Sequence, residues 1–242
     1  MQAMLRILEK MFPVQRHEWP KTLLLLAIST LLGIGFSISR ASSEALFLTR
    51  FGVEYLPYLQ LANPILALVA TTIYGVYASR MSDDRILVYT ILVSIPFILV
   101  IRLLMELEVS WVYFMLFAFV LAYAAVLATS WSIYLPGLYD VQESKRLIPF
   151  ISSGALIGTI IGGVGVAFSV PLIGAANILF VWIASLLGVV LLVRSMGRLF
   201  TAMNTAARKV VKKPAGKQAG VWQSLKEGVT YSRTSALFMT TA

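Results

Sequence analysis

The sequence predicts an all-α membrane protein with six transmembrane helices. Of its 242 residues, 59% are apolar and 13% are charged, and the mean hydropathy is +0.84. A typical soluble domain carries about 45–50% apolar and about 25% charged residues. Stretches of about 20 apolar residues, long enough to cross a bilayer as a helix, recur along the chain. We expect spans at Thr22–Ser39, Leu56–Ala78, Ile86–Leu104, Trp111–Tyr134, Ile148–Val170 and Ala175–Val193.

The segments outside these spans define the expected organisation. Residues 1–20 predict an amphipathic helix on the membrane surface, with a flexible tail as the alternative, and residues 21–195 form the six-helix bundle. Residues 196–221 are basic and contain Pro214, which is typical of a linker. In residues 222–242 an amphipathic lead-in precedes renewed apolar sequence, so we expect a seventh helix that is cut, in a fragment of a longer protein.

Lysine and arginine predict the orientation. Fifteen lie in the N-terminal segment, the second and fourth connections and the segment after the sixth span, against three on the opposite side. Membrane proteins collect these residues on the cytoplasmic side. The net charge of +9 is thereby explained without nucleic acid as a partner. We expect a multi-pass protein of the bacterial inner (cytoplasmic) membrane, with its N-terminus in the cytoplasm and the lipid bilayer as its surroundings.

The composition also excludes several kinds of chemistry. The chain contains no cysteine, which rules out disulfides, thiolate nucleophiles and cysteine-ligated zinc, and His17 is its single histidine. The spans contain no histidine cluster, carboxylate pair or activated serine. We therefore expect no enzyme, no cofactor and no metal site.

Polar side chains inside the first two spans are costly in lipid unless they face a cavity or another helix. Helical spacing places them on one face of each span: Ser29, Gly33, Ser37, Arg40 and Glu44 on the first, and Gln60, Asn63, Ala67, Thr71 and Tyr74 on the second. Two such stripes on neighbouring helices predict a water-accessible substrate pathway. The alternatives are an Arg40–Glu44 ion pair at the outer interface and a kink at Asn63 with Pro64.

Two later spans carry further candidates. Tyr123 and Tyr134 on the fourth span suit either stacking on a planar ligand or interface anchoring and core packing. On the fifth span, Gly154, Gly158 and Gly162 recur every four residues. This spacing predicts close helix packing, with a glycine-lined substrate surface as the alternative.

Charged residues gather at two connections on the predicted cytoplasmic side. They are Arg80, Asp83 and Arg85 at the first, and Glu143, Lys145 and Arg146 at the second. Opposite charges at the inner ends of spans can open and close a gate, and the alternative is a pair of solvated loops.

Several of these segments resemble the ATP/ADP (nucleotide) transporter family of plastids, intracellular bacteria and their free-living relatives. The similarity lies in Arg40-Ala-Ser-Ser-Glu44-Ala-Leu-Phe-Leu48, in Phe51-Gly-Val-Glu54-Tyr-Leu-Pro57, and in Asp140-Val-Gln-Glu143-Ser-Lys145-Arg146-Leu-Ile-Pro149 with the glycines that follow. It covers about residues 12–193 in order and spacing. Arg40 matches a basic position that helps to hold nucleotide phosphates in the family. The family has a second basic residue just before the acidic one, and in this chain that position is occupied by Ser43.

The resemblance implies a major-facilitator-like fold of twelve helices, of which this chain would be the N-terminal half, built from two three-helix inverted repeats. A second six-helix half would follow in the same chain. The implied function is alternating-access transport, by exchange (antiport) or uptake, of ATP/ADP or a related anionic metabolite. In this interpretation Arg40 contacts the anion, Glu44 orients Arg40, and Gln60, Asn63, Tyr123 and Tyr134 contact the rest of the substrate. The alternative is a membrane anchor or sensor for a cytoplasmic domain.

Overall fold

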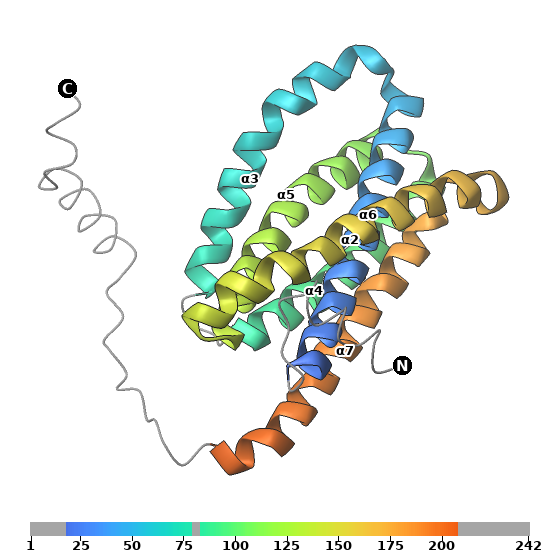
Figure 1. Ribbon diagram of the computed structural model, residues 1–242. Coiled ribbons are helices and arrows are strands. Elements are labelled where there is room, and N and C mark those ends of the chain that lie inside the picture. Colours follow the sequence, from blue (N-terminus) through green and yellow to red (C-terminus); the bar gives the residue numbers. More distant parts are fainter. Residues whose placement is uncertain (1–17, 79–82, 208–242) are drawn as a thin grey trace, which may run out of the picture. The chain divides into compact units, whose positions relative to one another are not determined.

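Six long helices make up the computed structural model, which describes residues 18–78 and 83–207 (Figure 1). Each is long and apolar enough to cross a membrane, and the described part of the chain contains no strand. The predicted all-α membrane protein with six spans is therefore confirmed. The helices are α2 (Trp19–Phe51), α3 (Leu56–Ala78), α4 (Asp83–Leu104), α5 (Ser110–Tyr134), α6 (Val141–Ile173) and α7 (Ile178–Ala207), with short 3-10 turns η1 (Val53–Tyr55), η2 (Met105–Leu107) and η3 (Pro136–Leu138).

Three helices extend beyond the apolar stretches that predicted them. Helix α2 continues through Phe51, so the Arg40 region is helical. Helix α6 begins at Val141 because Asp140 and Glu143 form a capping box, in which each side chain meets the other residue's backbone N–H. Helix α7 continues through Ala207, so the first residues of the predicted basic linker are helical as well.

Some predictions fall outside the described residues. They are the amphipathic N-terminal helix up to residue 17, Arg80, the linker from residue 208 and the start of a seventh helix.

Polar contacts at the helix ends show that α2 and α6 run in the same direction and α5 in the opposite one. Arg50, at the end of α2, donates to the carbonyl oxygen of Glu108 just before α5 (2.7 Å). At the other end, Arg146 in the first turns of α6 pairs with Glu18, the residue before α2. The starts of α2 and α6 therefore share one end of the bundle with the finish of α5.

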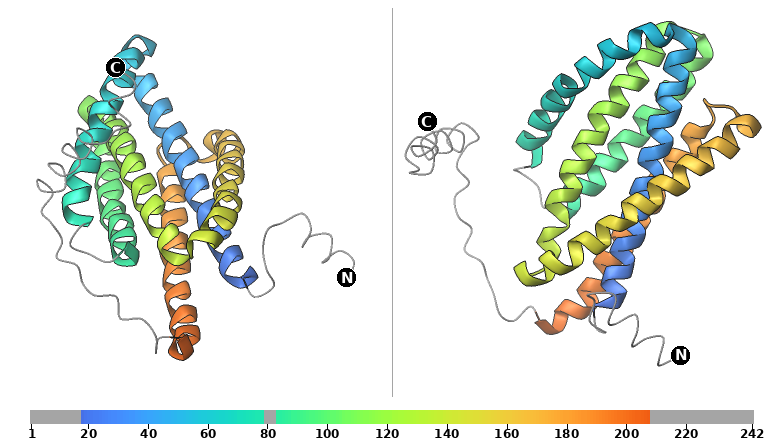
Figure 2. Two further views of the ribbon diagram at one scale, coloured as in Figure 1. Left: turned by 60° about the vertical axis from the view of Figure 1, so that its left-hand side comes forward. Right: turned by 45° about the horizontal axis from the view of Figure 1, so that its top comes forward.

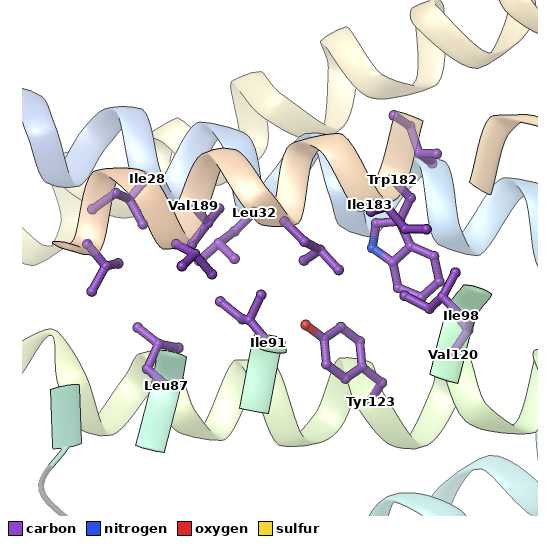
Figure 3. Packing of buried hydrophobic residues seen from close by; sticks show 14 of the residues in the cluster. Ile28, Leu32, Leu87, Ile91, Ile98, Val120, Tyr123, Trp182, Ile183 and Val189 are labelled. Carbon is purple, nitrogen blue, oxygen red and sulfur yellow. The ribbon is translucent and has the colours of Figure 1, made fainter. Parts of the chain in front are cut away.

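The apolar core lies between α2, α4, α5 and α7. Figure 3 shows side chains from these four helices meeting, among them Leu32 from α2, Ile91 from α4, Tyr123 from α5 and Trp182 from α7. Burying such side chains stabilises the bundle by about 1.5–3 kcal/mol each where water is the alternative. In lipid the gain comes from close packing instead.

Helices α3 and α6 lie at the periphery of this core. Most large apolar side chains of α3 are exposed, and so are those of the second half of α6, including Phe168 and Leu172. Helix α3 packs on α5, and α6 packs on α2. The two peripheral helices therefore attach to different members of the core.

Candidate functional site

Helices α2 and α6 cross with almost no space between their backbones. A Cβ atom added to Gly158 would overlap the carbonyl group of Thr30, and one added to Gly33 would overlap the carbonyl of Ala155. Only glycine has no Cβ, so these two positions allow a backbone-to-backbone contact that any other residue would push apart. We call this contact the crossing.

The other two glycines of the predicted series also face α2. A Cβ at Gly154 would lie 2.7 Å from the carbonyl oxygen of Leu26, and one at Gly162 would lie 2.8 Å from that of Ile34. The four-residue spacing therefore follows one packed face of α6 from Gly154 to Gly162. The structure places these glycines against a helix, and Gly33 of the predicted polar stripe lies at the same contact.

Beyond the crossing the two helices separate. Gly162 is the last buried residue of α6, and a Cβ added to Gly165 would meet no atom within 4 Å. Figures 1 and 2 show α6 turning away from the second half of α2 in all three views. We call residues 37–44 of α2 and residues 163–173 of α6, along which the two helices diverge, the wedge.

Arg40 and Glu44 lie on the α2 side of the wedge. Helical spacing puts them on the face that carries Gly33, one and two turns past Ser37, whose Cβ lies near Gly162. Arg40 Nε donates to Glu44 Oε1 at 2.6 Å, and each side chain is about one-third exposed (32% and 35%). The wedge thus contains an ion pair that is neither buried in the core nor fully exposed.

The α6 side of the wedge is uncharged. Gly165, Ser169 and Leu172 continue the face of the packed glycines by helical spacing, and the stretch 163–173 contains no charged residue. Arg40 and Glu44 are also the only charged residues in the stretch 37–44. The wedge therefore contains one guanidinium and one carboxylate, both partly exposed, among uncharged residues.

A set of contacts joins α2 to the η3–α6 turn on the opposite side of the crossing. Glu18 Oε1 accepts from Arg146 Nη2 at 2.5 Å, and Glu18 is only 6% exposed. Lys21 Nζ donates to the carbonyl oxygen of Leu138 and lies 3.9 Å from the centroid of the Tyr139 ring. We call these contacts the latch.

Tyr139 contributes a second contact to the latch. Its hydroxyl lies 3.4 Å from the Thr22 hydroxyl. Burial raises the pKa of the Tyr139 phenol above its ordinary value, and the nearby Glu18 and Glu143 carboxylates add to this, against a smaller lowering by Thr22. The phenol therefore stays neutral and able to donate.

The other predicted substrate contacts do not gather around Arg40. Tyr123 stacks on Phe119 and meets Trp182 in the core, and Tyr134 is buried with its hydroxyl 3.7 Å from Met196 Sδ. These positions correspond to the core-packing alternative. On α3, Gln60 is exposed and Asn63 is half-buried. No hydrogen bond joins either of them to Arg40 or Glu44 in the part of the chain that the structure describes.

Of the predicted gate residues, some make contacts with other residues and others are exposed. Arg146 pairs with Glu18, and Glu143 completes the capping box of α6, whereas Lys145 is exposed on the same helix. Arg85 is exposed near the start of α4, which begins at Asp83. The second connection thus belongs to the latch, with a partner in Glu18 that the sequence analysis did not single out.

Comparisons with protein-family models, curated proteins and solved structures found no match. The site therefore has to be interpreted from its own geometry. Its distinctive elements are the crossing, the latch on one side of it, and on the other side a wedge that holds an ion pair.

Proposed function

We propose that this protein is a membrane transporter that works by alternating access and binds an anionic substrate at Arg40. The observation that carries the proposal is the Arg40–Glu44 pair in the wedge. Charges within a transmembrane helix are costly, and they commonly mark a substrate or ion pathway. A guanidinium that is partly exposed among uncharged residues is suited to bind a carboxylate or a phosphate through its N–H donors.

The helix contacts support a repeat architecture for this carrier. Helix α2 packs on α6 and, through Gly35, against Trp182 and Ser185 of α7, whereas α5 packs on α3 and α4. The first helix of each three-helix group (α2–α4 and α5–α7) therefore contacts the second and third helices of the other group. We propose that the groups are the two inverted repeats of a major-facilitator-like half, with a second six-helix half completing the transporter.

Ser43 bears on the substrate class. It is 1% exposed and donates to the carbonyl oxygen of Arg40, so it lies away from the wedge. A triphosphate in a low-dielectric site needs several counter-charges, and the described wedge supplies Arg40 alone. We propose that the substrate is a nucleotide or a related metabolite with an anionic group that one guanidinium can bind, and that ATP/ADP-type exchange is the first activity to test.

We further propose that the latch end is cytoplasmic. Lys21 and Arg146 belong to the latch, and Lys145 lies exposed beside it on α6. An excess of lysine and arginine beside short connections sets orientation in the inner membrane. The latch would then close the cytoplasmic side when the wedge is open on the other.

The test is transport in proteoliposomes that contain the full-length protein. Labelled ATP, ADP and AMP, and inorganic phosphate, are offered with and without the same compound inside. Arg40→Gln should reduce transport at least tenfold. The matched control is Arg102→Gln, because Arg102 is bound to Asn177 (2.7 Å) and lies outside the wedge.

An Arg40→Gln protein that transports at the wild-type rate would disprove the anion contact. Absence of transport for all four probes would reject nucleotide and phosphate cargo and favour the anchor or sensor function.

A further inference from the structure

We infer that Glu44 neutralises Arg40 in the empty site, so that the unloaded carrier can reorient and the protein performs net transport instead of obligate exchange. This inference rests on the proposed transporter function and concerns how the carrier reorients after the substrate has left the site. It starts from the 2.6 Å distance between Arg40 Nε and Glu44 Oε1.

The first consideration is the net charge of the site when no substrate is bound. An alternating-access carrier moves its site past an apolar barrier, and an uncompensated charge makes that movement slow. No other charged residue lies along residues 37–44 or 163–173, the two walls of the wedge. The spans of α3 and α5 contain none either. Within the described residues Arg40 is therefore neutralised from its own helix, one turn away, and this part of the empty site carries no net charge.

The second consideration is the geometry of the Arg40–Glu44 pair. A guanidinium binds carboxylates and phosphates with the same two-pronged set of N–H donors. Glu44 thus occupies the position that an anionic group of the substrate would take, and the substrate must displace it. With a singly charged anion the loaded site then carries one net negative charge, and a cation that enters from the same side as the substrate would balance it.

Removal of Glu44 should then convert the protein into an exchanger. In Glu44→Gln the empty site carries the full charge of Arg40, whereas the site loaded with a monoanion is neutral. Reorientation of the empty carrier should fall on the order of a hundredfold, the factor expected for an uncompensated charge at mid-membrane. Exchange of bound substrate should persist.

The absence of cysteine allows a test that needs no knowledge of the substrate. Ser169→Cys places one thiol on the α6 wall of the wedge, in full-length protein from which any cysteine outside residues 1–242 has been removed. A membrane-impermeant maleimide is applied, without substrate, to right-side-out and inside-out vesicles that contain the full-length protein. We expect labelling from both sides in this single-cysteine protein, and at least tenfold slower labelling from one side when Glu44→Gln is added.

The double change Arg40→Gln/Glu44→Gln is the control, because it removes both charges and should restore labelling from both sides. That recovery also shows that the variants fold. If Glu44→Gln is labelled from both sides as fast as its parent, the inference is wrong while alternating access stands. If the parent and both variants are labelled from one side only, the wedge does not alternate and the proposed function fails with the inference.

Discussion

The two halves of the α2–α6 pair differ although the same two helices form both. Before the crossing, the latch joins α2 to the η3–α6 turn through Glu18–Arg146 and through the contacts of Lys21. After the crossing, α6 has no buried residue, Arg40 and Glu44 pair with each other across one helical turn, and Arg50 binds the carbonyl oxygen of Glu108 before α5. Polar contacts between α2 and the start of α6 thus fix one half, whereas in the other half no described ion pair joins α2 to α6.

This difference indicates a division of labour in the proposed carrier. The crossing lets two helices touch backbone to backbone, so that a small change of angle there is amplified at the far ends. The latch opposes such a change on its own side. The wedge has no corresponding contacts between α2 and α6 in the described residues, and motion of α6 relative to α2 should therefore concentrate there.

The crossing should give the largest effect on stability. Gly158→Ala places a Cβ on the carbonyl of Thr30 and must separate the two backbones, at a cost of about 3 kcal/mol. Gly165→Ala is the matched control, because its Cβ meets nothing and alanine favours the helix by up to about 1 kcal/mol. Thermal unfolding in detergent measures both, and equal melting temperatures would disprove the close crossing.

The latch should give the next effect. Arg146→Met leaves the Glu18 carboxylate, which is only 6% exposed, without its guanidinium. We expect a loss of about 2 kcal/mol, below the value for a fully buried pair because Arg146 is 30% exposed. Adding Glu18→Gln should recover at least half of the loss in thermal unfolding, and a double variant as unstable as the single one would show that the pair is not the cause.

The wedge pair should contribute much less to stability. Glu44→Gln breaks an i,i+4 pair whose members are each about one-third exposed, so the expected loss is about 0.3–0.5 kcal/mol. The same unfolding assay, with Arg146→Met beside it, compares the two ion pairs directly. A loss as large as that of Arg146→Met would mean that the wedge pair is a structural element and not a site kept for a ligand.

Tyr139 should give the smallest effect, and it should depend on pH. Because burial raises the pKa of its phenol in the folded protein, the stability that it contributes is complete below the unfolded pKa of about 10 and is lost as the pH rises through the folded pKa. Between pH 8 and pH 11 the wild type should therefore lose more stability than Tyr139→Phe. Identical pH profiles would contradict a half-buried neutral phenol in the latch.

The sequence predicted the parts of this site that follow a helical repeat. Arg40 and Glu44 on one face, and glycines every four residues on α6, can be found because one helix sets their spacing. The latch could not be predicted, because Glu18 and Arg146 are 128 positions apart and only the packing of α2 on α6 brings them together.

The sequence also could not predict the residue at which the close contact between α2 and α6 ends. Gly163 and Gly165 continue a run of small residues, yet the tight contact with α2 ends at Gly162: a Cβ added to Gly163 would lie 3.5 Å from Ser37 Oγ, and one added to Gly165 would meet no atom within 4 Å. The sequence also could not predict the surroundings of Tyr123, because an aromatic residue inside a span has the same sequence pattern whether it faces a ligand or the core. Its burial against Phe119 and Trp182 depends on which helices surround it.

The central claim, that α2 and α6 are held at the latch and free at the wedge, can be tested most directly by distance measurements between spin labels. Since the chain has no cysteine, paired cysteines at the exposed positions Leu23 and Ser152 report on the latch side, and Thr49 and Leu172 report on the wedge side. Pulsed electron paramagnetic resonance in nanodiscs should give one narrow distance for the first pair and a broad or two-peaked distribution for the second. Equally narrow distributions for both pairs would contradict the claim.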